Sequence, residues 1–296
     1  MRSREMVLTD KFSRFNPRIT AYHGENALAL GYAADLAYSK PESVESTLRS
    51  WGFQEVDFLS ASTRMIDTQC FVAATPSCIL VSFRGTQEFK DWLTDAEINL
   101  IPGPGGYLVH EGFNRALLSV WNHVWRLIEQ YQVQFSTTQP TLWFTGHSLG
   151  AALATLATAH TLMEKLRPVQ GLYNFGSPRV GNDTFQTAFD RGFESQSFRF
   201  VNNNDVVTTI PPAGFILRYR HIGTLRYFDE DGDLFEYIGF WHRLLDCLEG
   251  VYKDIGKPGL DFFKDHSMED YIKLLKKNRH RDHLSNRVGE SLFLQS

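Results

Sequence analysis

The chain has 296 residues, of which 43% are hydrophobic and 22% are charged, with a formal net charge of −4. These values are ordinary for a globular protein that buries one large core, and no run of 18 apolar residues predicts a membrane span. The negative balance gives no footprint for nucleic acid and no strong attraction to anionic membranes, so any contact with lipid is expected to be mainly apolar.

Residues 1–20 are expected to lie as an arm on the surface of a single domain that covers residues 1–296. The arm contains several Arg and Lys residues, and no apolar stretch typical of a signal peptide follows them. The expected location is therefore cytoplasmic, with a trimmed leader or another route of export left open.

The first regular elements are predicted to be a helix and a hairpin. Apolar residues recur at helical spacing from Glu25 to Tyr38. Phe71–Thr75 and Cys78–Phe83 are short β-rich runs separated by a Pro-Ser pair, which predicts a β-hairpin.

Cysteine usage argues against both a disulfide framework and a zinc site. The three cysteines, Cys70, Cys78 and Cys247, show no metal-binding spacing. Cys70 and Cys78 can meet if they lie on neighbouring strands, but buried free thiols are the stronger expectation. No metal or cofactor is expected.

Beyond residue 114, helical and strand patterns alternate. The predicted helices are Asn114–Tyr131, Ser148–Leu166, Thr184–Phe189 and Met268–Lys277, and the strands are Thr141–Thr145, Gly171–Phe175, Ser197–Val201 and the extended Phe215–Phe228, with a strand and then a helix in Leu234–Leu248. This alternation favours an α/β fold with a mostly parallel central sheet flanked by helices. The acidic run Glu230–Asp233 predicts a hairpin turn, because it lacks the spaced ligands of a calcium loop.

The run Gly146–Gly150 reads GHSLG and matches the G-x-S-x-G pattern of a nucleophile turn. It lies between a predicted strand and a predicted helix, which is the setting that this pattern needs. The two glycines remove side chains that would collide in so tight a turn. Ser148 then stands at a helix N-terminus, where free amides stabilise an oxyanion, and it is the predicted nucleophile. The alternative is a serine that only caps the helix.

Two residues are candidates for an oxyanion hole. Leu149 follows the nucleophile and is expected to supply one backbone amide. Thr86 follows the buried run Ile79–Phe83 and can offer both its amide and its hydroxyl. The alternative role for Thr86 is an ordinary helix cap.

Residues 87–106 combine a short amphipathic run with a Pro/Gly-rich stretch, which makes them a candidate lid. Trp92, Leu93, Ile98 and Leu100 would face the pocket when the lid is closed. A fixed surface helix with a stiff turn is an equal alternative.

Several stretches, in this order along the chain, resemble class 3 lipases, the family of fungal triacylglycerol lipases and some plant phospholipases. They are Val81–Thr86, Val109–Phe113, Thr145–Ala152, Tyr173–Asn182, Asn204-Asp205 with Pro211-Pro212, and Asp265–Met268. The run FGSPRVGN within Tyr173–Asn182 is particularly specific. The resemblance implies an α/β-hydrolase fold and a triad of Ser, Asp and His in that order.

Asp205 follows the predicted strand Ser197–Val201, at the end of a strand where such folds keep catalytic groups. By resemblance it matches the family acid, and the alternative is a turn residue that binds its own backbone. Chemistry alone leaves five later histidines open as the base, because any exposed imidazole titrates near neutral pH. These are His221, His242, His266, His280 and His283. The family pattern favours His266 and makes His110 and His147 supporting groups.

Together these residues predict a serine carboxylic-ester hydrolase, similar to triacylglycerol lipases, that works through an acyl-enzyme. The expected partner is a lipid ester, met at a lipid–water interface, with no nucleic acid. A phospholipase A1 and a soluble-ester or feruloyl esterase stay open as alternatives, because fold does not decide the substrate. A catalytically silent hydrolase fold that serves as a binding module is the alternative of another class.

Overall fold

A central sheet of eight strands organises the fold, in the order β1-β2-β3-β6-β7-β9-β11-β12. The computed structural model describes residues 11–62, 67–86, 99–203, 205–211, 218–236 and 265–281. The strands of this sheet are β1 (Glu55–Ser62), β2 (Asp67–Ala74), β3 (Cys78–Phe83), β6 (Thr141–His147), β7 (Gly171–Phe175), β9 (Ser197–Asn202), β11 (Thr224–Phe228) and β12 (Leu234–Glu236). Strands β3, β6, β7, β9 and β11 are parallel, which confirms the predicted mostly parallel sheet.

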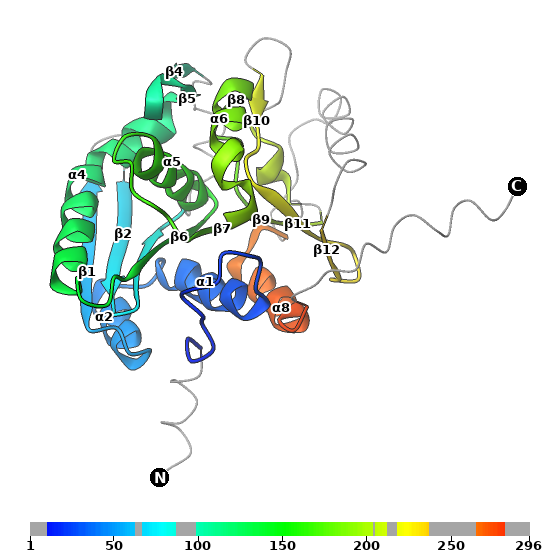
Figure 1. Cartoon of the computed structure of the whole chain (residues 1–296). Coiled ribbons are helices and arrows are strands. Elements are labelled where there is room, and N and C mark those ends of the chain that lie inside the picture. Colours follow the sequence, from blue (N-terminus) through cyan, green and yellow to red (C-terminus); the bar gives the residue numbers. More distant parts are fainter. Residues whose placement is uncertain are drawn as a thin grey trace, which may run out of the picture.

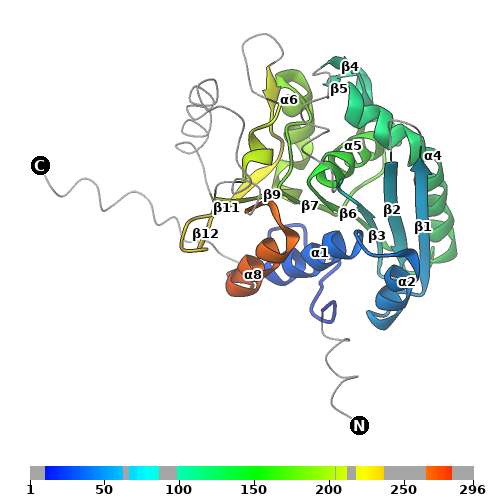
Figure 2. The same ribbon diagram turned by 180° about the vertical axis from the view of Figure 1, so that it is seen from behind.

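Helices cover both faces of this sheet (Figure 1). They are α1 (Gly24–Leu36), α2 (Pro41–Ser50), α4 (Glu111–Gln134), α5 (Leu149–Met163), α6 (Asp183–Phe193) and α8 (Met268–Asn278), with short 3-10 turns η1 (Pro104–Gly106), η2 (Glu194–Gln196) and η3 (Val206–Thr209). Helices α1, α2 and α8 lie on one face, and α4, α5 and α6 lie on the other (Figure 2). None of the helices in the described ranges is long and apolar enough to cross a membrane.

The two faces of the sheet carry two separate hydrophobic cores. Along β6, Leu142 and Phe144 join the core under α4 and α5, whereas Trp143 joins the core under α1 and α8. Because parallel strands in such a sandwich are buried on both faces, their sequences are continuous apolar runs, and this is the pattern that made them easy to predict.

A second sheet of four short strands lies beside the first, in the order β10-β8-β5-β4. Its strands are β4 (Leu100–Pro102), β5 (Leu108–His110), β8 (Gly181–Asn182) and β10 (Tyr219–Arg220). The sequence patterns did not predict this sheet, because strands of two or three residues have no measurable periodicity.

The predicted hairpin is present, with Ala74 opposite Ile79 at its closed end. Cys70 and Cys78 are both free and buried, as expected, and burial raises the pKa of the Cys78 thiol to about 11. Cys247 lies outside the described residues. The acidic turn also forms as predicted, because β11 and β12 pair on either side of it and the Asp229 carboxylate accepts the backbone amides of Asp231 and Asp233.

Residues 11–20 of the expected surface arm are anchored to the domain by aromatic side chains. Phe12 is only 8% exposed, and its ring stacks on Trp51 with 5.4 Å between centroids. Phe15 packs edge-on against Trp143 of β6. The backbone of this segment is irregular, yet Phe12 belongs to the core under α1 and α8. Residues 1–10 lie outside the described ranges.

Candidate functional site

Ser148 is the single residue between the end of strand β6 and the start of helix α5. Its backbone has φ 59° and ψ −128°, a strained region that residues other than glycine rarely adopt. A Cβ on Gly146 would approach the Ala151 nitrogen to 2.8 Å, and a Cβ on Gly150 would approach the Phe83 carbonyl carbon to 2.8 Å. Both glycines are therefore required by close backbone contact, which confirms the physical reason predicted for them.

The side chain of Ser148 is buried. The residue is 1% exposed, and its backbone amide donates to the Phe175 carbonyl at 3.0 Å. Among the residues that the structure describes, none hydrogen-bonds to Ser148 Oγ. A buried hydroxyl is costly to leave unpaired, and such costs are concentrated at functional sites. The bond from Oγ to His266 is thus not formed, although apo sites often tighten only with substrate bound.

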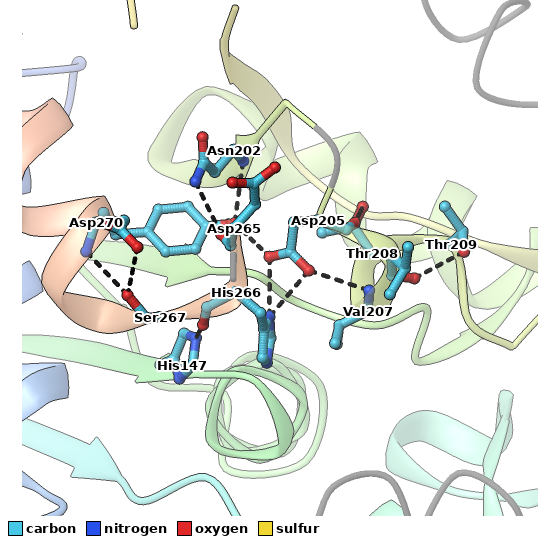
Figure 3. A network of polar contacts seen from close by, with 12 residues as sticks. His147, Asn202, Asp205, Val207, Thr208, Thr209, Asp265, His266, Ser267 and Asp270 are labelled. Atoms are coloured by element: carbon cyan, nitrogen blue, oxygen red, sulfur yellow. Dashed lines mark hydrogen bonds and ion pairs between the residues drawn. The ribbon is translucent and has the colours of Figure 1, made fainter. Parts of the chain in front are cut away.

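Asp205 and His266 form a close hydrogen-bonded pair, shown in Figure 3. Nδ1 of His266 lies 2.9 Å from both carboxylate oxygens of Asp205, whose side chain is fully buried. The Val207 amide donates to the same carboxylate at 3.0 Å. Asp205 thus binds its own backbone turn and also the histidine, and its role as the catalytic acid stays a prediction.

Gly176 leaves the space that this pair needs. It follows β7 with φ 57°, a left-handed conformation that favours glycine. A Cβ there would lie 2.7 Å from Asp205 Oδ2 and 2.9 Å from His266 Nδ1. The loops after β7 and β9 and the start of α8 thus converge at one point.

Tyr271 is a contributor to the site that sequence reasoning missed. Its hydroxyl donates to Asp205 Oδ2 at 2.6 Å and accepts the Asn202 amide at 3.1 Å. Burial, and then the charge of Asp205, raise the pKa of Tyr271 well above its ordinary value, so that it stays a protonated donor. Its position on the inner face of the predicted helix Met268–Lys277 was the one available signal.

The base loop is also held from the side of the nucleophile turn. Nε2 of His147 lies 2.7 Å from the backbone oxygen of His266, and the two rings lie 4.4 Å apart (Figure 3). Because His147 directly precedes Ser148, this contact brings the predicted base beside the predicted nucleophile. Asn202 holds the other flank through its side-chain amide, which donates to the Asp265 carbonyl at 2.8 Å.

The remaining histidine candidates lie elsewhere. His221 bonds the Thr208 carbonyl through Nε2 at 2.7 Å, and the His280 side chain is 68% exposed. His242 and His283 lie outside the described residues. His110 instead caps α4, because its Nδ1 accepts the Phe113 amide at 3.3 Å.

The predicted oxyanion donors flank the nucleophile turn. Strand β3 lies parallel to β6 with Phe83 beside Gly146, so the loop after β3 ends next to Ser148. A Cβ on Gly85 would lie 3.2 Å from the Ser148 Cβ. Thr86 is the next residue, and Leu149 is the first residue of α5. Their roles as donors stay predictions.

The candidate lid falls mostly outside the described residues, which exclude 87–98 and with them Trp92, Leu93 and Ile98. The end of the segment is described. Leu100 belongs to β4, which pairs antiparallel with β5, and η1 follows it. This part is held in a sheet, and the lid predicted for residues 87–106 stays a prediction.

Comparison with known proteins gives a consistent family. Residues 80–215 match the family model described as Lipase (class 3). Secreted mono- and diacylglycerol lipase 1 of Fusarium solani is 34% identical over 191 residues, covering 62% of this chain and 54% of the relative. Phospholipase A1-II 1 of Oryza sativa subsp. indica is 34% identical over 163 residues, covering 46% and 40%. The chain thus spans about half the length of these curated relatives.

Solved structures agree on the fold. A mutant of MDLA from Penicillium cyclopium superposes with a TM-score of 0.64 at 24% identity, covering 82% of this chain and 95% of that one. The Rhizomucor miehei triacylglyceride lipase gives 0.59 at 24% identity, covering 71% and 82%. At this identity the likeness concerns the fold, which is that of the α/β hydrolases. With the matched family model and the curated relatives, it leads to one assignment: residues 80–215 of this chain match the class 3 lipase family.

Proposed function

We propose that this chain hydrolyses carboxylic esters of lipids through an acyl-enzyme on Ser148. The observation that carries the proposal is the buried Asp205–His266 pair, held at 2.9 Å beside a serine in a strained strand-to-helix turn. A strained backbone at a serine and a buried acid–imidazole pair both cost free energy of folding. Nucleophilic catalysis needs the two together, because the serine is activated by a base that an acid orients.

The proposed chemistry has two steps. Asp205 holds the proton on Nδ1 of His266, which leaves Nε2 as the base that takes the Ser148 proton. Ser148 attacks the ester carbonyl, and the amides of Thr86 and Leu149 stabilise the oxyanion. His266 then protonates the leaving alcohol and activates water, which releases the acid and restores the serine.

The substrate class is proposed from the relatives together with the site. The matched proteins are named as phospholipase A1, mono- and diacylglycerol lipase and triacylglycerol lipase, and all of these names specify lipid esters. We favour glycerolipids met at a lipid–water interface, with activity like that of a triacylglycerol lipase. Phospholipase A1 activity and the hydrolysis of soluble esters, including feruloyl esters, are the alternatives to be tested.

Location is a separate question. The cytoplasmic expectation gains no support from the relatives, because the matched lipases of Fusarium solani and Penicillium cyclopium are named as secreted. Export of this chain by a comparable route is the proposal that fits these relatives.

The test compares the wild type with Ser148→Ala, using p-nitrophenyl esters from acetate to palmitate below and above their solubility limits. The wild type should turn over long-chain esters with a rate increase at the interface, and Ser148→Ala should lose activity by a factor on the order of 10⁴ or more. Ser46→Ala, at an exposed position on α2, is the matched control and should keep full activity.

A fluorophosphonate probe gives the second measurement. The wild type should form a covalent adduct on Ser148, and the Ser148→Ala variant should form none. Near wild-type turnover by Ser148→Ala would refute the site assignment. A wild type that neither labels nor hydrolyses any ester would favour the silent binding module.

A further inference from the structure

We infer that Tyr38 and His147 are positioning residues, which join the oxyanion loop at Gly85 to the base loop at His266 by a chain of two directed hydrogen bonds and the close contact of Tyr38 with Gly85. This chain is called the Tyr38–His147 bridge below. The inference rests on the proposed function and adds to it a pair of side chains that touch neither substrate nor the reacting atoms.

The contacts of the bridge are short and at least partly buried. The hydroxyl of Tyr38, just beyond the end of α1, lies 2.8 Å from Nδ1 of His147. Nε2 of His147 lies 2.7 Å from the backbone oxygen of His266. His147 is 5% exposed, so water competes little for either ring nitrogen.

The direction of each bond follows from what each group can do. A carbonyl oxygen only accepts, so Nε2 of His147 must carry a proton. Burial, and then the nearby His266, lower the pKa of His147 well below its ordinary value, so the ring is neutral and carries that one proton alone. Nδ1 is therefore an acceptor, and the donor to it is the hydroxyl of Tyr38.

The chain continues into the oxyanion loop. The Tyr38 oxygen lies against Gly85, close to where a Cβ of that residue would stand. Burial raises the pKa of Tyr38, so its hydroxyl keeps the proton that it donates to His147. A Cβ on Gly85 would collide with the Tyr38 oxygen and would lie 2.7 Å from the His147 carbonyl oxygen, which explains why this position carries glycine.

The bridge fixes the base from the side opposite to its acid. Asp205 holds the imidazole of His266 at Nδ1, and His147 holds the backbone of the same residue. With both ends held, the direction of the imidazole Nε2 is set. Misplacement of a catalytic group by about 1 Å can cost on the order of 100-fold in rate, so such a support has a measurable effect.

The kinetic test uses Tyr38→Phe, His147→Gln and His147→Phe. Tyr38→Phe removes one donor without changing shape, and kcat should fall on the order of 10-fold while KM changes less than about twofold. His147→Gln offers an amide donor and an acceptor and should retain more activity than His147→Phe, which offers neither. Tyr32→Phe, on helix α1 a few residues before Tyr38, is the matched control and should match the wild type.

The spectroscopic test reads the tautomer directly, by ¹⁵N NMR of His147 between pH 6 and 8. The titratable groups that face this ring are Tyr38, His266 and Tyr271, with Arg84 against the outer face of Tyr38. We expect a neutral ring protonated on Nε2 in the wild type and in Ser148→Ala. Tyr38→Phe should alter the Nδ1 shift.

The two proposals fail in different ways. Absence of any hydrolysis by the wild type would remove the proposed function, whereas the tautomer of His147 can still be read in that protein. A ring protonated on Nδ1, or on both nitrogens, would overturn the bridge. So would wild-type kcat in Tyr38→Phe and His147→Phe while Ser148→Ala is inactive.

Discussion

The buried polar groups around Asp205 are hydrogen-bonded to one another, and few of them have a second partner to replace a lost one. Tyr271, Val207 and His266 all donate to its carboxylate. Val207 lies in the turn that Asp205 itself caps, whereas His266 and Tyr271 come from the start of α8 and the residues before it. In a low-dielectric interior, loss of one donor leaves a partner with an unmade bond, and that is more costly than the average hydrogen bond. Single substitutions here therefore report on the network.

Tyr271→Phe should destabilise the protein by about 1–3 kcal/mol, because both Asp205 and the Asn202 amide lose a partner. Activity should fall, but less than in Asp205→Asn, in which the histidine loses its acidic partner. Urea unfolding and ester turnover measure the two effects. Tyr107→Phe, at a residue 36% exposed, is the control and should leave both unchanged. Equal stability of Tyr271→Phe and the wild type would contradict the role given to this hydroxyl.

His110 predicts a loss of stability in acid. Burial lowers the pKa of His110 from 6.5 to about 4, so between these values the unfolded chain binds the proton and the folded chain does not. Its contribution is fully present above pH 6.5 and is lost as the pH falls towards 4, with a slope of at most about 1.4 kcal/mol per pH unit.

The variant His110→Asn isolates this effect. An asparagine can still accept the Phe113 amide as an N-cap, but it does not titrate. Urea midpoints at pH 7 and pH 5 should therefore differ less in His110→Asn than in the wild type. His147 acts in the same direction and is present in both proteins, so it cancels in the comparison. Equal slopes would mean that His110 does not titrate as argued.

At the level of elements, the site is built where strands end and helices begin. Ser148 precedes α5, Asp205 caps η3, and His266 is followed by the cap of α8. The first backbone amides of a helix have no partner within the helix, so they can bind an anion or a side chain that precedes the helix. Such bonds also fix the position of the residues at the helix start. The caps are thus part of what orients the candidate triad.

Ser267→Ala should test this at α8. The Ser267 hydroxyl accepts the Asp270 amide at 3.1 Å and donates to its carboxylate at 2.7 Å. Its removal should cost about 1 kcal/mol in the free energy of unfolding. It should also lower kcat, because His266 is the neighbouring residue. Ser267→Thr keeps the cap and serves as the control. A kcat unaffected by Ser267→Ala would show that the cap stabilises α8 without orienting the histidine.

At the scale of the whole molecule, the irregular N-terminal segment, residues 11–20, packs against the core under α1 and α8. Phe12 contacts Trp51 and Phe53, which follow α2 at the edge of the sheet. Pro17 accepts a hydrogen bond from the Thr141 hydroxyl at the start of β6. The segment therefore stabilises the molecule even though its backbone forms no regular element.

Phe12→Ala should destabilise the protein by about 3–5 kcal/mol, as expected for a buried aromatic ring. Val133→Ala, at a residue 75% exposed, is the control and should stay within about 0.5 kcal/mol of the wild type. Thermal and urea unfolding provide the measurement. A loss below about 1 kcal/mol for Phe12→Ala would mean that the segment is only loosely attached.

Elements with strong periodicity were predictable, and weak ones were not. The predicted helix Asn114–Tyr131 corresponds to α4, and the strand Thr141–Thr145 corresponds to β6. Helix α2 and strand β1 had no prediction, because α2 buries only Val44 and Leu48 and β1 is a half-exposed edge strand. Their apolar patterns are too sparse for the periodicity rules to detect.

The nucleophile turn, the parallel sheet and the glycines around Ser148 follow from local chemistry, because strand, turn and helix signals are adjacent in the chain. The pairing of Asp205 with His266, across 61 positions, does not follow from local chemistry. Nor do the contacts of Tyr38, which lies just after the first described helix, and of Tyr271, which lies on the last one. Side chains so distant in sequence meet only because the sheet brings the ends of its strands to one edge, and that order of strands is a property of the folded chain.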